Sequence, residues 1–130
     1  MKRMLTVLIA MTLMMGLSIH AADDPSIEGA TRKGIQKAMN DHIQANKVDT
    51  KYVIYDAVAN KLLKLDYDYL HDGIIKKGGF YVSCADFNDN TGTTYDIDIL
   101  AVEQNGTFKV VDTIVHKVGD EKRTYTLSEE

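Results

Sequence analysis

The chain has few of the residues that stabilise small secreted domains by covalent or rigid means. Its 130 residues include one cysteine, one proline and no tryptophan. An intramolecular disulfide is therefore excluded, and the fold has to be stabilised by packing. Cys84 lies between Val82 and Ala85 in an apolar segment, which favours a buried, small hydrophobic role. A disulfide to a second molecule is the alternative.

Long apolar runs are also scarce, and the chain has one, at its N-terminus. Lys2-Arg3 precedes an apolar segment of about 14 residues, Met4–Leu17, and small residues follow at Ala21-Ala22. This layout is typical of a secretory signal peptide, and the segment is shorter than the roughly 20 residues that a membrane-spanning helix needs. We therefore predict a signal peptide over residues 1–21, with cleavage after Ala21 or Ala22, and export to the periplasm or the extracellular space. Residues 22–130 are predicted to form a single soluble domain with no membrane span.

Basic residues do not predominate. The chain has 15 Lys and Arg against 19 Asp and Glu, for a net charge of −4. The leader carries two basic residues and no acidic ones, so the mature chain has 13 − 19 = −6. A net negative surface disfavours binding to nucleic acid and to anionic lipid, and we expect neither as a partner.

An amphipathic helix is predicted over residues 26–46. Apolar residues recur at three- and four-residue steps from Ile27 to Ile43, and Asp24-Pro25 supplies an N-cap carboxylate followed by proline. Gly29 and Gly34 each lower helix propensity by about 1 kcal/mol relative to alanine. Either the first turn frays or these glycines mark a close approach to a sheet.

From Lys51 onward the pattern changes to period two and β-rich composition. Asn105-Gly106 predicts a two-residue type I′ hairpin turn. The expected class is α+β: one N-terminal helix packed on an antiparallel sheet of four to six strands. The predicted strands cover residues 51–56, 62–71, 80–87, 93–103 and 107–118, with a short segment at 74–75 and an edge candidate at 123–127.

The hairpin turn also predicts a register. It places Ile99 opposite Asp112 and Tyr95 opposite His116, on the face that we assign to the helix. A β-bulge near Asp112 would shift these pairs by one residue. If Phe87 also pairs with Thr93, this face contains Tyr81, Ser83, Ala85, Tyr95, Ile97, Ile99 and Ala101, with Asp112 and His116 as its polar members.

Asp112, His116 and Tyr95 are the candidate catalytic residues on this register. A carboxylate, an imidazole and a phenol side by side can transfer protons. The same groups also form satisfied polar patches in sheet cores, which is the commoner case. Motifs for zinc, for a phosphate-binding loop and for a nucleophile elbow are absent from the sequence.

The loop Asp86–Gly92 is the candidate metal site. Asp86, Asn88 and Asn90 present oxygen ligands at alternate positions, as calcium loops do. Ile97 stands at position twelve, where such loops carry a bidentate glutamate. Because Asp, Asn and Gly also form turns without a metal, we predict a structural turn and no metal or cofactor.

Three motifs carry a resemblance to a family: Cys84–Phe87, Tyr95–Asp98, and Ile114–Val118 followed by Arg123 and Tyr125. Over about 75 residues from Tyr52, the chain resembles an uncharacterised family of small exported bacterial proteins. The resemblance implies export but no known activity. The order of helix and meander is similar to cystatin-like and NTF2-like folds, as an analogy of architecture. The Gln-x-Val-x-Gly loop of cystatin protease inhibitors and the additional helices of NTF2-like enzymes are absent.

Tyrosine is abundant, with seven residues, all in predicted strands or at their ends. Tyrosine gives a sheet rigid, amphipathic contact area. We therefore expect a non-enzymatic binding or interaction module that holds a small ligand or a peptide on a tyrosine-bearing sheet face or at an edge strand. A small pocket enzyme that uses Asp112, His116 and Tyr95 is the alternative. The candidate ligand-binding residues are Tyr81, Tyr95, Asp112 and His116.

Overall fold

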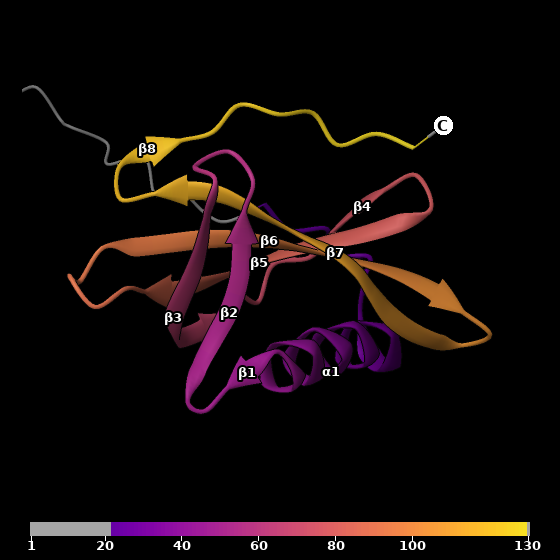
Figure 1. Cartoon of the computed structure of the whole chain (residues 1–130). Helices are drawn as coiled ribbons and strands as arrows, with labels where there is room; N and C mark the ends of the chain where they lie inside the picture. The colour runs from indigo at the N-terminus through magenta and orange to yellow at the C-terminus, as the bar shows by residue number, and fades with distance from the viewer. Residues whose placement is uncertain (1–21, 130) are drawn as a thin grey trace, which may run out of the picture.

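The computed structural model describes residues 22–129 (Figure 1). This part of the chain contains one helix and eight strands. The predicted signal peptide, residues 1–21, lies outside this part. The α+β class and the antiparallel sheet are confirmed, although the sheet has eight strands instead of four to six. The elements are α1 (Gly29–Ala45), β1 (Lys47–Val48), β2 (Lys51–Asp56), β3 (Lys61–Leu70), β4 (Ile75–Lys77), β5 (Phe80–Asn88), β6 (Thr94–Gln104), β7 (Thr107–Val118) and β8 (Glu121–Lys122).

The additional strands are short. β1 and β8 have two residues each and β4 has three, too few for an alternating pattern to be recognised in the sequence. The five longer strands match the predicted segments closely, and β2 and β7 match them to the residue. Within residues 22–129, no helix has the length and apolar character needed to cross a membrane.

The sheet is a meander with one interruption. Its strand order is β1-β2-β3-β5-β6-β7-β8, and every neighbouring pair is antiparallel. β3 and β4 share one edge of β5: β3 pairs with Ala85–Asn88 and β4 with Phe80–Val82. In Figure 1, α1 lies on one side of the sheet and the chain after β8 runs along the other side. The sheet therefore has one face under the helix and one partly covered by the C-terminal segment.

The helix begins later than predicted. Its N-cap residue is Glu28, and Asp24-Pro25 belongs to a separate turn before it. The Asp24 carboxylate accepts hydrogen bonds from the Ser26 N–H and hydroxyl at 2.9 and 2.7 Å. Gly29, the first residue of α1, has φ +56°. This left-handed conformation prevents the helix from extending further toward the N-terminus. The prediction of a start at residue 26 was therefore wrong, because the aspartate caps a turn instead of the helix.

The predicted apolar face of the helix is confirmed by burial. Ile35, Met39 and Ile43 are fully buried against the sheet. Burying side chains of this size contributes about 1.5–3 kcal/mol each. A Cβ atom at Gly34 would lie 2.8 Å from the ring of Phe108. Gly34 therefore marks a close approach between helix and sheet, one of the two roles predicted for the glycines.

The hairpin between β6 and β7 contains two bulges that the sequence did not show. The turn itself is type I′, as predicted, since Asn105 and Gly106 have φ 53° and 77°. Register shifts occur between Leu100 and Ala101 and between Asp96 and Ile97. Opposite each shift, β7 contains one extra residue.

These bulges overturn the predicted pairing beyond Ala101. Ile99 pairs with Thr113 instead of Asp112, and Tyr95 pairs with Val118 instead of His116. Because side chains alternate between the faces, the first bulge turns Asp112 away from the helix. The assignment of Asp112 and His116 to the helix face was therefore wrong.

The register between β5 and β6 differs from the prediction by two residues. Phe87 pairs with Tyr95 instead of Thr93. A shift of two residues leaves each side chain on its face, so Tyr81, Ser83 and Ala85 are buried as predicted.

The chain after β8 is not a strand. Residues 123–127, predicted as an edge candidate, are extended without sheet pairing, and the actual edge is β8. This C-terminal segment, residues 123–129, begins with a backbone hydrogen bond from the Arg123 N–H to the His116 carbonyl at 2.8 Å and is otherwise attached through side chains. Tyr125 donates a hydrogen bond to Asp98, and the Gly79 N–H donates one to the Glu129 carboxylate. The segment therefore crosses the sheet face opposite the helix.

Candidate functional site

Acidic and thiol side chains gather on the sheet face opposite α1. On β5, Cys84 and Asp86 alternate with buried core residues, and on β6 Asp96 and Asp98 do the same. The strand register places Cys84 opposite Asp98 and Asp86 opposite Asp96. We call this surface the polar face: Cys84, Asp86, Asp96 and Asp98, with His71 and His116 at its two sides.

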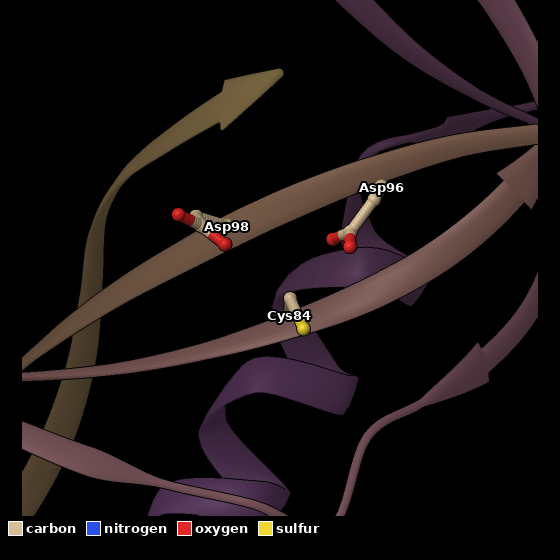
Figure 2. Close-up of side chains that lie close together, drawn as sticks. All are labelled: Cys84, Asp96 and Asp98. Carbon is tan, nitrogen blue, oxygen red and sulfur yellow. The ribbon is translucent and has the colours of Figure 1, made fainter. Parts of the chain in front are cut away.

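Three of these residues converge. One ligand atom each from Cys84, Asp96 and Asp98 lies within 4.8 Å of the others. Figure 2 shows the three side chains on the adjacent strands β5 and β6, with α1 behind the strands. Carboxylate oxygens and a thiol sulfur are all potential metal ligands, and they bring negative charge together when ionised.

Asp98 has the most hydrogen-bond partners in this group. It is buried, and its two carboxylate oxygens lie 3.2 and 3.1 Å from Nδ1 of His116. The Tyr125 hydroxyl donates a second hydrogen bond to Oδ2. Burial, followed by the hydrogen bond to Asp98 and the charge of Asp98, raises the pKa of Tyr125, so its hydroxyl stays protonated and remains a donor. Asp98 is therefore fixed from two sides.

Asp86 is fixed in a similar way at the other side of the face. Its Oδ1 lies 3.0 Å from Nε2 of His71. The His71 ring stacks on Tyr69, with centroids 4.7 Å apart and planes 12° apart. The Asp86 charge raises the pKa of Tyr69, which keeps that phenol neutral.

Asp96, between these two fixed carboxylates, has an unpaired oxygen. Its Oδ1 is buried and lacks a hydrogen-bond partner, the one such side-chain atom among residues 22–129. Burial raises the pKa of the Asp96 carboxyl group. A buried acceptor without a donor costs about 1–3 kcal/mol. The structure therefore contains a place where a positive or hydrogen-donating group would be stabilised.

Cys84 differs from the buried hydrophobic residue that the sequence predicted. It is only partly buried, and it faces carboxylates. Burial, followed by the charges of Asp96 and Asp98, raises the pKa of its thiol. A catalytic thiol needs the opposite environment, one that lowers the pKa. Without a bound cation, Cys84 is therefore a poor nucleophile.

Two hollows open beside the three converging side chains. The first, about 570 Å³, is lined by His71, Asp86 and Asp96, together with the β5–β6 loop and Lys117. The second, about 540 Å³, is lined by Asp98, His116 and the C-terminal segment. Asp96 and Asp98 thus face different hollows, and solvent reaches the cluster from either side.

The sequence-predicted site residues do not come together. Tyr81 and Tyr95 are buried in the core beneath the sheet, 7% and 4% exposed. Asp112 lies on the sheet face opposite α1, where it is exposed and its carboxylate accepts the Thr113 N–H at 2.8 Å. Of the four candidates, His116 alone contacts a carboxylate of the polar face, that of Asp98.

The loop Asp86–Gly92 uses its oxygens internally. Asp89 Oδ1 accepts hydrogen bonds from the Thr91 N–H at 2.8 Å, the Thr91 hydroxyl at 2.7 Å and the Thr93 N–H at 3.0 Å. Asn88 Oδ1 accepts one from the Thr94 hydroxyl at 3.0 Å. Of the calcium candidates, Asp86 therefore contacts His71, Asn88 closes the hairpin and Asn90 is exposed.

Sequence reasoning missed the convergence of Cys84, Asp96 and Asp98. A pattern was available, because Cys84 and Asp86 on one strand and Asp96 and Asp98 on the next alternate with apolar residues. Bringing them together requires the register between the two strands, and the predicted register was displaced by two residues.

Comparisons with models of known protein families, with curated proteins and with solved structures found no match for this chain. Inference about its function therefore depends on the geometry of the polar face.

Proposed function

We propose that this chain is an exported, non-enzymatic binding module that holds a small, positively charged ligand on the polar face. The observation that carries the proposal is the buried, unpaired Oδ1 of Asp96 between two further aspartates. This differs from the tyrosine-bearing face expected from the sequence, because the tyrosines Tyr81 and Tyr95 are inside the core.

The charge balance of the face supports a cationic ligand. Like charges on neighbouring strands repel, and partial burial strengthens the repulsion because water screens it less. His71 and His116 are each hydrogen-bonded to one carboxylate, Asp86 and Asp98. Asp96, between them, forms no ion pair within residues 22–129, although Lys117 is its cross-strand neighbour on β7. A cation at this point would relieve the repulsion and supply the missing partner.

The enzyme alternative receives less support. Tyr95 lies in the core, whereas Asp112 and His116 lie on the sheet face opposite α1. There Asp112 bonds only the Thr113 N–H, and His116 bonds Asp98. Proton transfer needs such groups within hydrogen-bond reach of one substrate. The protonated Cys84 thiol does not supply a nucleophile either.

Export and the detailed fold are parts of the same proposal. The N-terminal pattern of residues 1–21 supports secretion, which places the polar face outside the cytoplasm. A single helix against a meander of antiparallel strands also supports the analogy with cystatin-like and NTF2-like folds. Neither fold by itself assigns a ligand.

A thermal-shift panel tests the proposal. The probes are spermidine, arginine and divalent metal ions, with glutamate and glucose as acidic and neutral comparisons. A ligand present at 100 times its Kd stabilises the protein by about 2.7 kcal/mol. We expect at least one cationic probe to stabilise the wild type, and Asp96→Asn to remove most of the shift. Asp112→Asn is the matched control, since that carboxylate is exposed and bonds only its neighbour's N–H.

Two outcomes would contradict the proposal. One is a panel in which no cationic probe raises the melting temperature of the wild type. The other is a cationic probe whose shift is the same in the Asp96→Asn protein, because the ligand would then bind elsewhere.

A further inference from the structure

We propose that Cys84, Asp96 and Asp98 are the protein ligands of a divalent transition-metal ion, with Zn²⁺ as the best match. This inference deepens the proposed function, on which it rests, by naming the chemical class of the cation and the atoms that bind it.

The spacing of the ligand atoms suits one ion. Zn–S bonds are about 2.3 Å and Zn–O bonds about 2.0–2.2 Å, so ligand atoms in a tetrahedral site lie roughly 3.3–3.8 Å apart. The sulfur of Cys84 and one oxygen each of Asp96 and Asp98 already lie within 4.8 Å of one another. Small side-chain rotations would close the set around an ion without moving the strands.

A second, independent observation comes from the hydrogen-bond inventory. Oδ1 of Asp96 has less than 1 Å² of exposed surface and no donor among residues 22–129. Buried carboxylate oxygens normally have a partner. A metal ion bound between Asp96, Cys84 and Asp98 would supply that partner.

The surroundings resemble the outer shell of a metal site. Ligating carboxylates are usually held by further hydrogen bonds, and Asp98 is held by His116 and Tyr125. Three protein ligands leave a fourth position for water or a small ligand. The hollow lined by Asp96 and Lys117 gives that position access to solvent.

The donor set selects the kind of ion. Ca²⁺ and Mg²⁺ take oxygen ligands, so the thiol of Cys84 disfavours them. Cu⁺ favours sets made of thiolates and thioethers, and two of the three donors here are carboxylates. Zn²⁺ accepts both kinds. Binding would displace the proton of the Cys84 thiol to solvent and form a zinc–thiolate bond, with no change of oxidation state.

Metal titration of the purified protein, with its thiol kept reduced, tests the site. Isothermal titration with Zn²⁺ should show one saturable site per chain. Cys84→Ser and Asp96→Asn should each weaken binding at least 100-fold, while Asp112→Asn should leave it unchanged. Melting curves of the metal-free variants establish that each one is folded.

Two further measurements need no variant. Co²⁺ in place of Zn²⁺ should give a near-ultraviolet thiolate-to-metal charge-transfer band, which reports a metal–sulfur bond directly. Zn²⁺ should also slow alkylation of Cys84 by iodoacetamide. Absence of saturable Zn²⁺ binding, absence of the cobalt band, or equal Zn²⁺ affinity in Cys84→Ser would each overturn the site.

These results separate the two proposals. If spermidine or arginine binds in an Asp96-dependent way and metals do not, the cation-binding function stands and the metal site is wrong. If neither organic cations nor metals bind, both proposals are wrong.

Discussion

The carboxylate of Asp56 accepts two hydrogen bonds from the guanidinium of Arg123, at 2.7 and 2.8 Å, although the residues are 67 positions apart. Asp56 ends β2, and its side chain is 2% exposed. Arg123 follows β8, and its side chain is 21% exposed. Since β2 and β8 lie near opposite ends of the strand order, this pair joins the two outer parts of the sheet.

We predict that Arg123→Ala lowers the free energy of unfolding by about 3–5 kcal/mol, because it leaves the buried Asp56 carboxylate without a counter-charge. Arg123→Lys should lower the free energy of unfolding by less, since it retains the positive charge but loses the bidentate hydrogen bonding. Urea denaturation measures both. Lys33→Ala, an exposed change on α1, is the control. A loss below 1 kcal/mol for Arg123→Ala would show that the pair is not important for stability.

The same pair predicts a dependence of stability on pH. The hydrogen bonds from Arg123 hold the pKa of Asp56 below its ordinary value of 3.8. A carboxyl whose pKa is lower in the folded state stabilises the fold above its ordinary pKa, and this contribution is lost as the pH falls through the folded value. Stability should therefore decrease below about pH 4, and Asp56→Asn should show a smaller decrease. Parallel pH profiles of the two proteins would contradict this assignment.

The helix and the main strands could be predicted from the sequence because these segments are long enough for their helical or alternating pattern to be recognised. Ile35, Met39 and Ile43 identified the buried helix face, and Asn105-Gly106 identified the hairpin turn. Register was harder, because each bulge adds one residue that the alternation of polar and apolar side chains does not reveal.

The errors in register also explain why the predicted site was wrong. His116 was identified from the sequence, but its neighbours were not, because the predicted register paired it with Tyr95 instead of placing it beside Asp98. Cys84 looked apolar from its neighbours in the sequence, whereas its cross-strand partner is Asp98. Cross-strand neighbours, which sequence distance does not show, determine the chemistry of this face.

The contact between Gly34 and Phe108 predicts an unusual response to alanine. On an exposed helix surface, Gly→Ala stabilises by about 1 kcal/mol. Here the new Cβ would lie 2.8 Å from the Phe108 ring, and overpacking costs about 1–3 kcal/mol. We expect Gly34→Ala to destabilise the wild type and to stabilise the Phe108→Ala protein. Thermal unfolding of the four proteins in this double-mutant cycle measures the coupling. Equal effects in both backgrounds would show that the ring does not limit the site.

The loop Asp86–Gly92 is predicted to be stable without calcium, since Asp89 satisfies its N–H groups. Thermal unfolding with excess Ca²⁺ and with excess chelator should give the same melting temperature. Saturating a specific site at 100 times its Kd would add about 2.7 kcal/mol. At about 4–8 °C per kcal/mol, that would raise the melting temperature by more than ten degrees, and such a shift would show that the loop binds calcium.

Export predicts a defined N-terminus. Mass spectrometry of the protein from its native cell should find a chain that begins at Ala22 or Asp23. An intact Met1 on protein retained in the cytoplasm would exclude a cleaved signal peptide. The same measurement tests whether the polar face is exposed to the metal ions of a compartment outside the cytoplasm.

The bulges in β7 also affect whether two copies of the protein can associate through the edge of the sheet. β8 pairs with only Lys117 and Val118, so within residues 22–129 most of the outer edge of β7 has no neighbouring strand. A straight, twelve-residue edge would be a template for a strand from a second molecule. Bulges bend and twist such an edge and interrupt its regular spacing of donors and acceptors. We therefore expect the irregularity that turned Asp112 away from the helix also to disfavour edge-to-edge association.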